Sequence, residues 1–206
     1  MLGQQDNSAL LGPLSRRLDS DPPEDLDAAQ RGLLERLLPL YYRDLGPADL
    51  DLLDTADLVG ALAAHWRLLY QRQPDEVLLR VYNPVQEAHG WRCRDSVVEL
   101  ACPDMPFLVD SVSAALNRRG LVIRLTLHPV LRVTRDAAGR VTDLADASAA
   151  TAEQTAAANE AVIRLHIERQ PDDRLPDLAE SIRAVVADVR LATADWGPMR
   201  ERARQD

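Results

Sequence analysis

The chain has 206 residues, a hydrophobic content of 46%, a formal net charge of −9 and a pI near 4.9. Because binding to a phosphate backbone needs concentrated positive charge, this balance argues against a nucleic acid as a partner. The sequence contains no run of about 18 apolar residues and no basic-then-apolar start, so we expect neither a membrane span nor a signal peptide.

The first third of the chain is predicted to be a flexible tail followed by helices. Residues 1–27 are rich in Asp, Pro, Ser and Gln, which favours a mobile tail, although four leucines between positions 10 and 18 leave a short helix open. Over residues 28–73, leucines recur at helical spacing in two stretches, and Asp54 or Thr55 is the expected N-cap of the second. The pattern predicts a helical hairpin.

After Pro74 the apolar period changes to two, which is typical of strands. Residues 77–82 and 91–101 are predicted as two strands, and residues 106–119 as an amphipathic helix. The odd positions of 121–127 are apolar, whereas Arg124, Thr126 and His128 are polar. This alternation predicts a long strand with one buried face, interrupted at an edge or bulge by Pro129.

The sequence after this long strand predicts a hairpin turn, an insertion, a strand and a helix. Residues 136–139 favour a turn, and residues 145–160, rich in Ala, Thr and Ser, resemble a low-complexity insertion. Alternation over residues 163–167 predicts another strand. Apolar residues then step by three and four over 175–196, which predicts an amphipathic helix that ends before Gly197-Pro198.

The predicted order is strand, strand, helix, long strand, strand, helix. It equals the order of an ACT or ferredoxin-like unit whose last strand has moved to the front. We therefore predict an α+β fold, with an ACT/ferredoxin-like antiparallel sheet of permuted strand order over residues 74–200. Strand 77–82 should pair with strand 94–101 at the sheet edge, while helices 106–119 and 175–196 cover one face. The other face would meet water, the N-terminal helices or another chain.

Several short motifs occur in one order along the chain. They are Val81-Tyr82-Asn83-Pro84, Gly90-Trp91, Asp104-Met105-Pro106-Phe107-Leu108-Val109-Asp110-Ser111, His128-Pro129-Val130-Leu131-Arg132-Val133 and His166-Ile167-Glu168-Arg169-Gln170. Together they resemble the N-terminal region of the large bacterial NAD-specific glutamate dehydrogenases, from about Tyr41 onward. In that family this region is an ACT-like regulatory domain, and catalysis lies far downstream.

The resemblance places a candidate effector site in the strand–helix loop at residues 102–111. The candidate residues are Asp104, Met105, Pro106, Phe107, Asp110 and Ser111. Ligand-binding ACT loops typically read Asp-Arg/Lys-Pro-Gly-Leu, but here Met105 replaces the basic residue and Phe107 replaces the glycine. The alternative is a structural or interface role, in which Asp104 caps the helix and Pro106 lies in its first turn.

The resemblance implies a non-catalytic regulatory or assembly domain of an enzyme that oxidises L-glutamate to 2-oxoglutarate with NAD. The alternative is an amino-acid effector sensor at residues 102–111. All 24 basic residues are arginine, so the lysines on which such dehydrogenases rely are missing here. We therefore expect no catalytic residue and no cofactor in this segment, with NAD bound elsewhere in the parent enzyme.

The expected partners are the downstream domains of the same enzyme, further copies of the chain and, in the sensor alternative, an amino-acid effector. No metal site is expected, because His128 and His166 fall on polar strand faces and are interpreted as surface histidines. His65 lies on the apolar face of its helix and is expected in the core or in an interface. Two cysteines nine positions apart, Cys93 and Cys102, suit reduced thiols, so the expected location is cytoplasmic.

Overall fold

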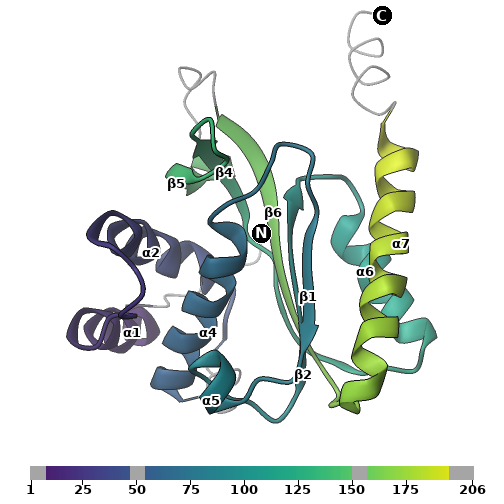
Figure 1. The fold of residues 1–206 in the computed structure, drawn as a ribbon, viewed down its shortest axis with the longest axis horizontal. Helices are drawn as coiled ribbons and strands as arrows, with labels where there is room; N and C mark the ends of the chain where they lie inside the picture. The colour runs from purple at the N-terminus through teal and green to yellow at the C-terminus, as the bar shows by residue number, and fades with distance from the viewer. Residues whose placement is uncertain (1–7, 47–53, 150–156, 195–206) are drawn as a thin grey trace, which may run out of the picture.

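The computed structural model describes residues 8–46, 54–149 and 157–194. A six-stranded antiparallel sheet lies between two layers of helices (Figure 1). One layer contains α1 (Ser8–Ser20), α2 (Ala28–Tyr41) and α4 (Thr55–Leu69), with the short α5 (Gln86–His89) beside it. The other layer contains α6 (Leu108–Arg118) and α7 (Leu175–Thr193). The α+β class and the ACT-like sheet with two helices on one face are confirmed.

The sheet is built around one long central strand. The strand order is β1 (Leu78–Tyr82), β2 (Ser96–Pro103), β6 (Ala157–Ile167), β4 (Val130–Arg135) and β5 (Val141–Asp146). The remaining strand, β3 (Ile123–Leu127), also pairs with β6. β1 pairs with β2 at the edge, as predicted, and their register sets Arg80 opposite Glu99. Because β2 in turn sets Glu99 opposite Arg164 of β6, three charged residues form one row across the sheet.

The predicted long strand is divided into β3 and β4 at His128-Pro129, and both halves pair with β6. The proline has no N–H to donate, but its carbonyl accepts a hydrogen bond of 3.1 Å from the backbone N–H of Val162. A register shift at Arg124 places Ile123 in the core under α6 and α7, whereas Leu125 and Leu127 pack toward the N-terminal helices. The prediction that these odd positions share one face is therefore wrong, because the bulge inserts an extra residue.

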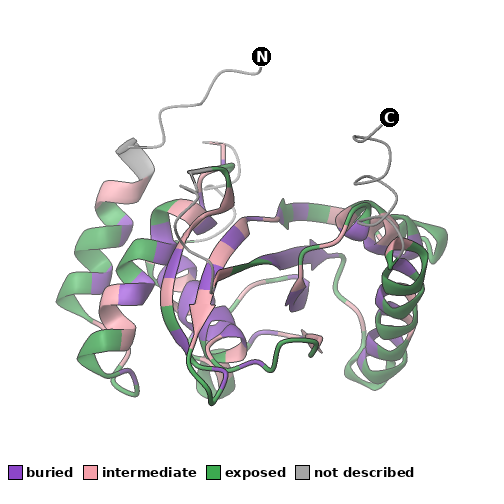
Figure 2. Ribbon diagram, turned by 90° about the horizontal axis from the view of Figure 1, so that it is seen from above, coloured by how far each residue is buried: buried purple, intermediate pink, exposed green. Residues whose placement is uncertain are grey.

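The sheet separates two hydrophobic cores. On β6, Ile163, Leu165 and Ile167 pack against α6 and α7, as their spacing predicts. Arg164 and His166 point to the opposite face, but they are only 1% and 3% exposed. Helix α4 covers Arg164, which donates to the carbonyl of Ala61, whereas Trp91 and Asp95 lie against His166. The interpretation of His166 as a surface histidine is therefore wrong, whereas His65 is fully buried as predicted. Figure 2 shows the buried residues on the inner sides of both helical layers.

Two predicted irregular segments are more ordered than expected. Within the predicted tail, residues 8–20 form α1, whose Leu14 and Leu18 are buried one turn apart against α2 and α4. Burying these leucines outweighs the backbone hydrogen bond that Pro13 removes. The predicted insertion at 145–160 overlaps the end of β5 and the start of β6, and residues 150–156 lie outside the described part of the chain.

Candidate functional site

The loop at residues 102–111 connects β2 to α6 and begins as a continuation of the sheet. The backbone N–H of Asp104 donates to the carbonyl of Asn159 at 3.0 Å, which extends the pairing of β2 with β6. The helix N-cap is Phe107, three residues later, and no side chain caps the helix there. The prediction that Asp104 caps the helix with Pro106 in its first turn is therefore wrong.

Phe107 has an unusual backbone conformation. Its φ of 64° and ψ of 8° lie in the left-handed region, and it is the one described non-glycine residue with positive φ. This conformation costs an L-residue about 1 kcal/mol or more, whereas glycine adopts it freely. Its carbonyl accepts the helical hydrogen bond from the N–H of Ser111 at 2.9 Å. Phe107 is 61% exposed.

The structure brings three of the six candidate residues together. Phe107, Asp110 and Ser111 line a groove of about 570 Å³ between α6 and α7. Met105 lines a separate groove of about 240 Å³ near the end of α7. Asp104 and Pro106 line neither of these two grooves. The candidate site is therefore the α6–α7 groove rather than the whole loop.

The α6–α7 groove combines an apolar floor with charges of both signs. Val185 and Val189 of α7 supply aliphatic surface, while Asp110, Asp188 and Arg118 supply the charges. Such a mixture is typical of a recognition surface, since apolar area gives affinity and charge gives orientation.

His128, at the junction of β3 and β4, is electrostatically linked to the loop. Burial lowers the pKa of His128, and the carboxylates of Asp104 and Asp110 act in the opposite direction. Its Nε2 atom is buried and has no hydrogen-bond partner among the described residues. Protonation of this histidine is therefore disfavoured near neutral pH. Within the part of the chain that the structure describes, no group of three or more His, Cys, Asp and Glu residues could hold a metal ion.

A buried charge row under the N-terminal helices was not predicted from the sequence. Glu99 accepts hydrogen bonds from Arg80 and Arg164, and from the hydroxyl of Tyr82 at 3.0 Å. Arg80 also donates to the carbonyl of Ala64 in α4 at 3.1 Å, which ties the helix to the sheet. A signal was present, because Glu99 interrupts a run of apolar residues in a strand that is buried on both faces.

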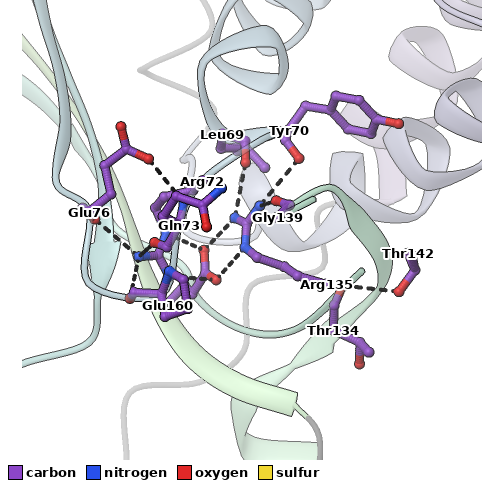
Figure 3. Close-up of polar contacts among 11 residues, drawn as sticks. Leu69, Tyr70, Arg72, Gln73, Glu76, Thr134, Arg135, Gly139, Thr142 and Glu160 are labelled. Carbon is purple, nitrogen blue, oxygen red and sulfur yellow. Dashed lines mark hydrogen bonds and ion pairs between the residues drawn. The ribbon is translucent and has the colours of Figure 1, made fainter. Parts of the chain in front are cut away.

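A second buried cluster ties the end of α4 to the sheet (Figure 3). Glu160 of β6 lies between Arg72 and Arg135, with N–O distances of 2.7 Å to each. Arg135 donates five hydrogen bonds, two to Glu160 and three to the carbonyls of Leu69, Tyr70 and Gly139. Because these bonds use all five N–H groups of a guanidinium, Arg135 acts as a structural clamp and has no donor left for a ligand.

Comparison with known proteins identifies the family. The family model described as "Glutamate dehydrogenase, ACT1 domain" matches residues 37–182, a range that includes the loop and α6. The NAD-specific glutamate dehydrogenase of Halomonas elongata is 34% identical over 192 residues, which cover 93% of this chain and 11% of that protein. That of Pseudomonas aeruginosa is 38% identical over 151 residues, which cover 73% of this chain and 9% of that protein.

The chain thus spans about a tenth of the length of these relatives. The resemblance inferred from the short motifs is confirmed by a match over most of the chain. The described helices and strands are those of an α+β domain, and no described helix is long and apolar enough to cross a membrane. This chain belongs to the ACT1-domain family of the glutamate dehydrogenases.

Proposed function

We propose that this chain is a non-catalytic regulatory or assembly domain of an NAD-specific glutamate dehydrogenase, the enzyme for which both relatives are named. The parent reaction is then the oxidative deamination of L-glutamate to 2-oxoglutarate, with NAD bound by parts of the enzyme outside this chain. The domain acts through contacts with other domains or copies, and its effect on the active site is a coupling free energy, typically about 1–3 kcal/mol.

The observation that supports assembly most strongly is the geometry of Phe107. A loop that holds a small ligand through its backbone N–H groups needs an open approach, which glycine provides. Here an aromatic side chain stands at that position and is 61% exposed. An exposed aromatic residue beside an apolar groove suits a protein–protein contact, where aromatic anchors are enriched.

The α6–α7 groove also favours a second candidate function, amino-acid sensing. Its volume of about 570 Å³ falls within the range of roughly 300–1,000 Å³ that is usual for small-molecule sites. Asp110 and Ser111 offer it a carboxylate and a hydroxyl. Calorimetric titration with glutamate, aspartate and arginine tests this function, with Asp110→Ala as the variant and Asp104→Ala as the control outside the groove. Saturable binding that is lost only in Asp110→Ala supports sensing, whereas no binding to the folded chain favours assembly.

The assembly role is tested in the whole enzyme that carries this chain. Phe107→Gly is compared with Leu191→Ala, which removes an apolar side chain that is 76% exposed but does not line the groove. We expect Phe107→Gly alone to change the sedimentation coefficient or the response to effectors. A changed KM for glutamate or NAD, with assembly and effector response both unaltered, would contradict the proposal.

A further inference from the structure

A cavity of about 410 Å³ is lined by the buried cluster of Arg72, Arg135 and Glu160 (Figure 3). The segment after α4, the turn between β4 and β5 and the start of β6 supply the rest of its lining. Its volume falls within the range of roughly 300–1,000 Å³ that is usual for small-molecule sites. The residues that line the cavity therefore indicate which class of small molecule it can hold.

The cluster leaves an excess of one buried positive charge. The side chains of Arg72 and Glu160 are each 2% exposed, and that of Arg135 is 11% exposed. Burial raises the pKa of Glu160, but hydrogen bonds from Arg135 and Arg72 outweigh burial and lower this pKa below its ordinary value. Two guanidinium groups thus share one carboxylate. Glu76 and Asp136 are exposed residues, so water screens their charges, and an anion in the cavity would complete the charge balance.

Arg72 also has hydrogen-bonding capacity left for a ligand. Its Nε donates to Glu160 at 3.2 Å, and its Nη1 donates to three backbone carbonyls. Its Nη2 contacts Glu160 at 2.7 Å, and among the described residues no second acceptor serves the two N–H groups of this atom. Because Arg135 already uses all five of its N–H groups, a ligand carboxylate would bind mainly through a charge-assisted hydrogen bond from Arg72.

Apolar side chains form much of the remaining wall. They are Pro74, Val133, Ala137 and Ala158. Such a surface suits an aliphatic chain. Asp136 also lines the cavity, in the exposed turn after β4, where its Oδ1 accepts the N–H groups of Ala138 and Arg140. Its negative charge would repel a second carboxylate at the far end of a ligand, so the lining favours a monocarboxylate.

We propose that this cavity binds a small aliphatic monocarboxylate without an α-amino group, with its carboxylate at Arg72 and its chain along the apolar wall. An α-ammonium group would lie beside the carboxylate and would be repelled by the guanidinium groups of Arg72 and Arg135. Fatty acids and 2-oxo acids share the required chemistry, whereas amino acids do not. The inference does not rest on the proposed assembly role, because no residue lines both this cavity and the α6–α7 groove.

The first experiment is calorimetric titration of the 206-residue chain, shown to be folded by circular dichroism, with probes that share a six-carbon chain. Hexanoate should bind saturably, with a Kd at least about tenfold below those of L-norleucine and hexylamine, which add or substitute a positive charge. 2-Oxohexanoate, which has a carboxylate but no ammonium group, should also bind at least about tenfold more tightly than L-norleucine. The tighter of the two carboxylates distinguishes a fatty-acid site from a 2-oxo-acid site.

Two variants place the binding in this cavity. Ala158→Leu fills part of the cavity and should raise the Kd of hexanoate by about tenfold or more. The matched control is Ala138→Leu, in the same turn but outside the lining, which should leave the Kd within about threefold. Asp136→Asn keeps an acceptor for the turn but removes the charge, so it should favour hexanedioate relative to hexanoate by about threefold.

Three results would overturn the proposal. They are the absence of saturable hexanoate binding up to about 20 mM, tighter binding of L-norleucine than of hexanoate, and equal hexanoate affinity in Ala158→Leu and Ala138→Leu. The comparison of probes uses the wild-type chain, so it decides the question even if Ala158→Leu does not fold. The assembly role is tested by Phe107→Gly, and its failure would leave this site unaffected.

Discussion

Replacing Glu99 with glutamine should destabilise the domain by about 3–5 kcal/mol, a large part of the stability of an ordinary domain. Glutamine keeps the volume of the side chain but removes its charge. The side chain of Arg80 is 34% exposed and can turn to water, whereas that of Arg164 is 1% exposed and remains buried without a counter-charge. The loss therefore comes mainly from Arg164.

The pKa of Glu99 gives a second measure of the same effect. Burial raises this pKa, but the charges of Arg164 and Arg80 outweigh burial and hold the pKa at about 2, against an ordinary value of 4.5. At 1.36 kcal/mol per pH unit, the difference corresponds to about 3 kcal/mol. Because the pKa is lowered in the folded state, this stabilisation is complete above pH 4.5 and is lost as the pH falls toward 2.

Urea unfolding followed by circular dichroism measures both effects. The free energy of unfolding of Glu99→Gln should fall below that of the wild type by about 3 kcal/mol at pH 5, and this gap should shrink by about 2 kcal/mol at pH 3. The matched control is Asp25→Asn, since Asp25 is 54% exposed and pairs with Arg67 on the surface. It should lose less than about 1 kcal/mol. Equal losses in the two variants, or a gap that does not change with pH, would refute the reasoning.

Three further predictions test the backbone and the buried histidine. Phe107→Gly should be more stable than Phe107→Ala by about 1 kcal/mol in thermal unfolding, because φ is positive there, and the opposite order would contradict the assigned backbone. Gly139→Ala should lower the free energy of unfolding by more than about 2 kcal/mol in the same assay, because the added Cβ atom would lie 2.5 Å from the carbonyl oxygen of Arg72 and φ is 80°. The control Gly32→Ala, whose Cβ atom meets no neighbour within 4 Å, should raise it by about 0.5–1 kcal/mol. Burial lowers the pKa of His65 to about 3, so the folded chain keeps this histidine neutral while the unfolded chain protonates it below about pH 6.5. Between pH 7 and pH 5 the free energy of unfolding should therefore fall by about 2 kcal/mol less in His65→Gln than in the wild type. If urea unfolding gave the same pH dependence for both proteins, His65 would not be held neutral.

The periodicity of the sequence predicted much of the sheet and its helices correctly. Strand β1, its pairing with β2 and the helices α6 and α7 follow from local alternation and helical spacing, which depend only on which face is apolar. The faces of β6 were harder to predict. Arg164 and His166 alternate with apolar residues, so the pattern indicates a solvent-exposed face. In the structure, the N-terminal helices cover Arg164, and Trp91 and Asp95 lie against His166. Whether a polar strand face is wet depends on elements far away in the sequence, and the local pattern carries no information on that.

The candidate site, too, could be predicted from the sequence only in part. The strand–helix loop could be located from the sequence, and three of its residues do line a groove. The left-handed backbone of Phe107 could not be derived from local propensity, since a phenylalanine rarely adopts it. The comparison of this loop with the glycine-containing loops of ACT domains was the available signal. It showed that Phe107 stands where those loops have glycine, the residue that adopts a positive φ most easily.

The two buried charge clusters bear on which surface suits the proposed assembly contact. Glu99 and Glu160 both lie in the sheet, and each fixes α4 through an arginine that also donates to a backbone carbonyl of that helix. Figure 3 shows the cluster around Glu160. Both clusters lie on the face of the sheet that the N-terminal helices cover, whereas α6 and α7 pack on the opposite face through apolar side chains. A partner that binds a rigid, exposed face loses less conformational entropy than one that binds a mobile segment. The α6–α7 side of the domain carries Phe107 and neither of these clamps. We therefore expect the proposed assembly contact on that side.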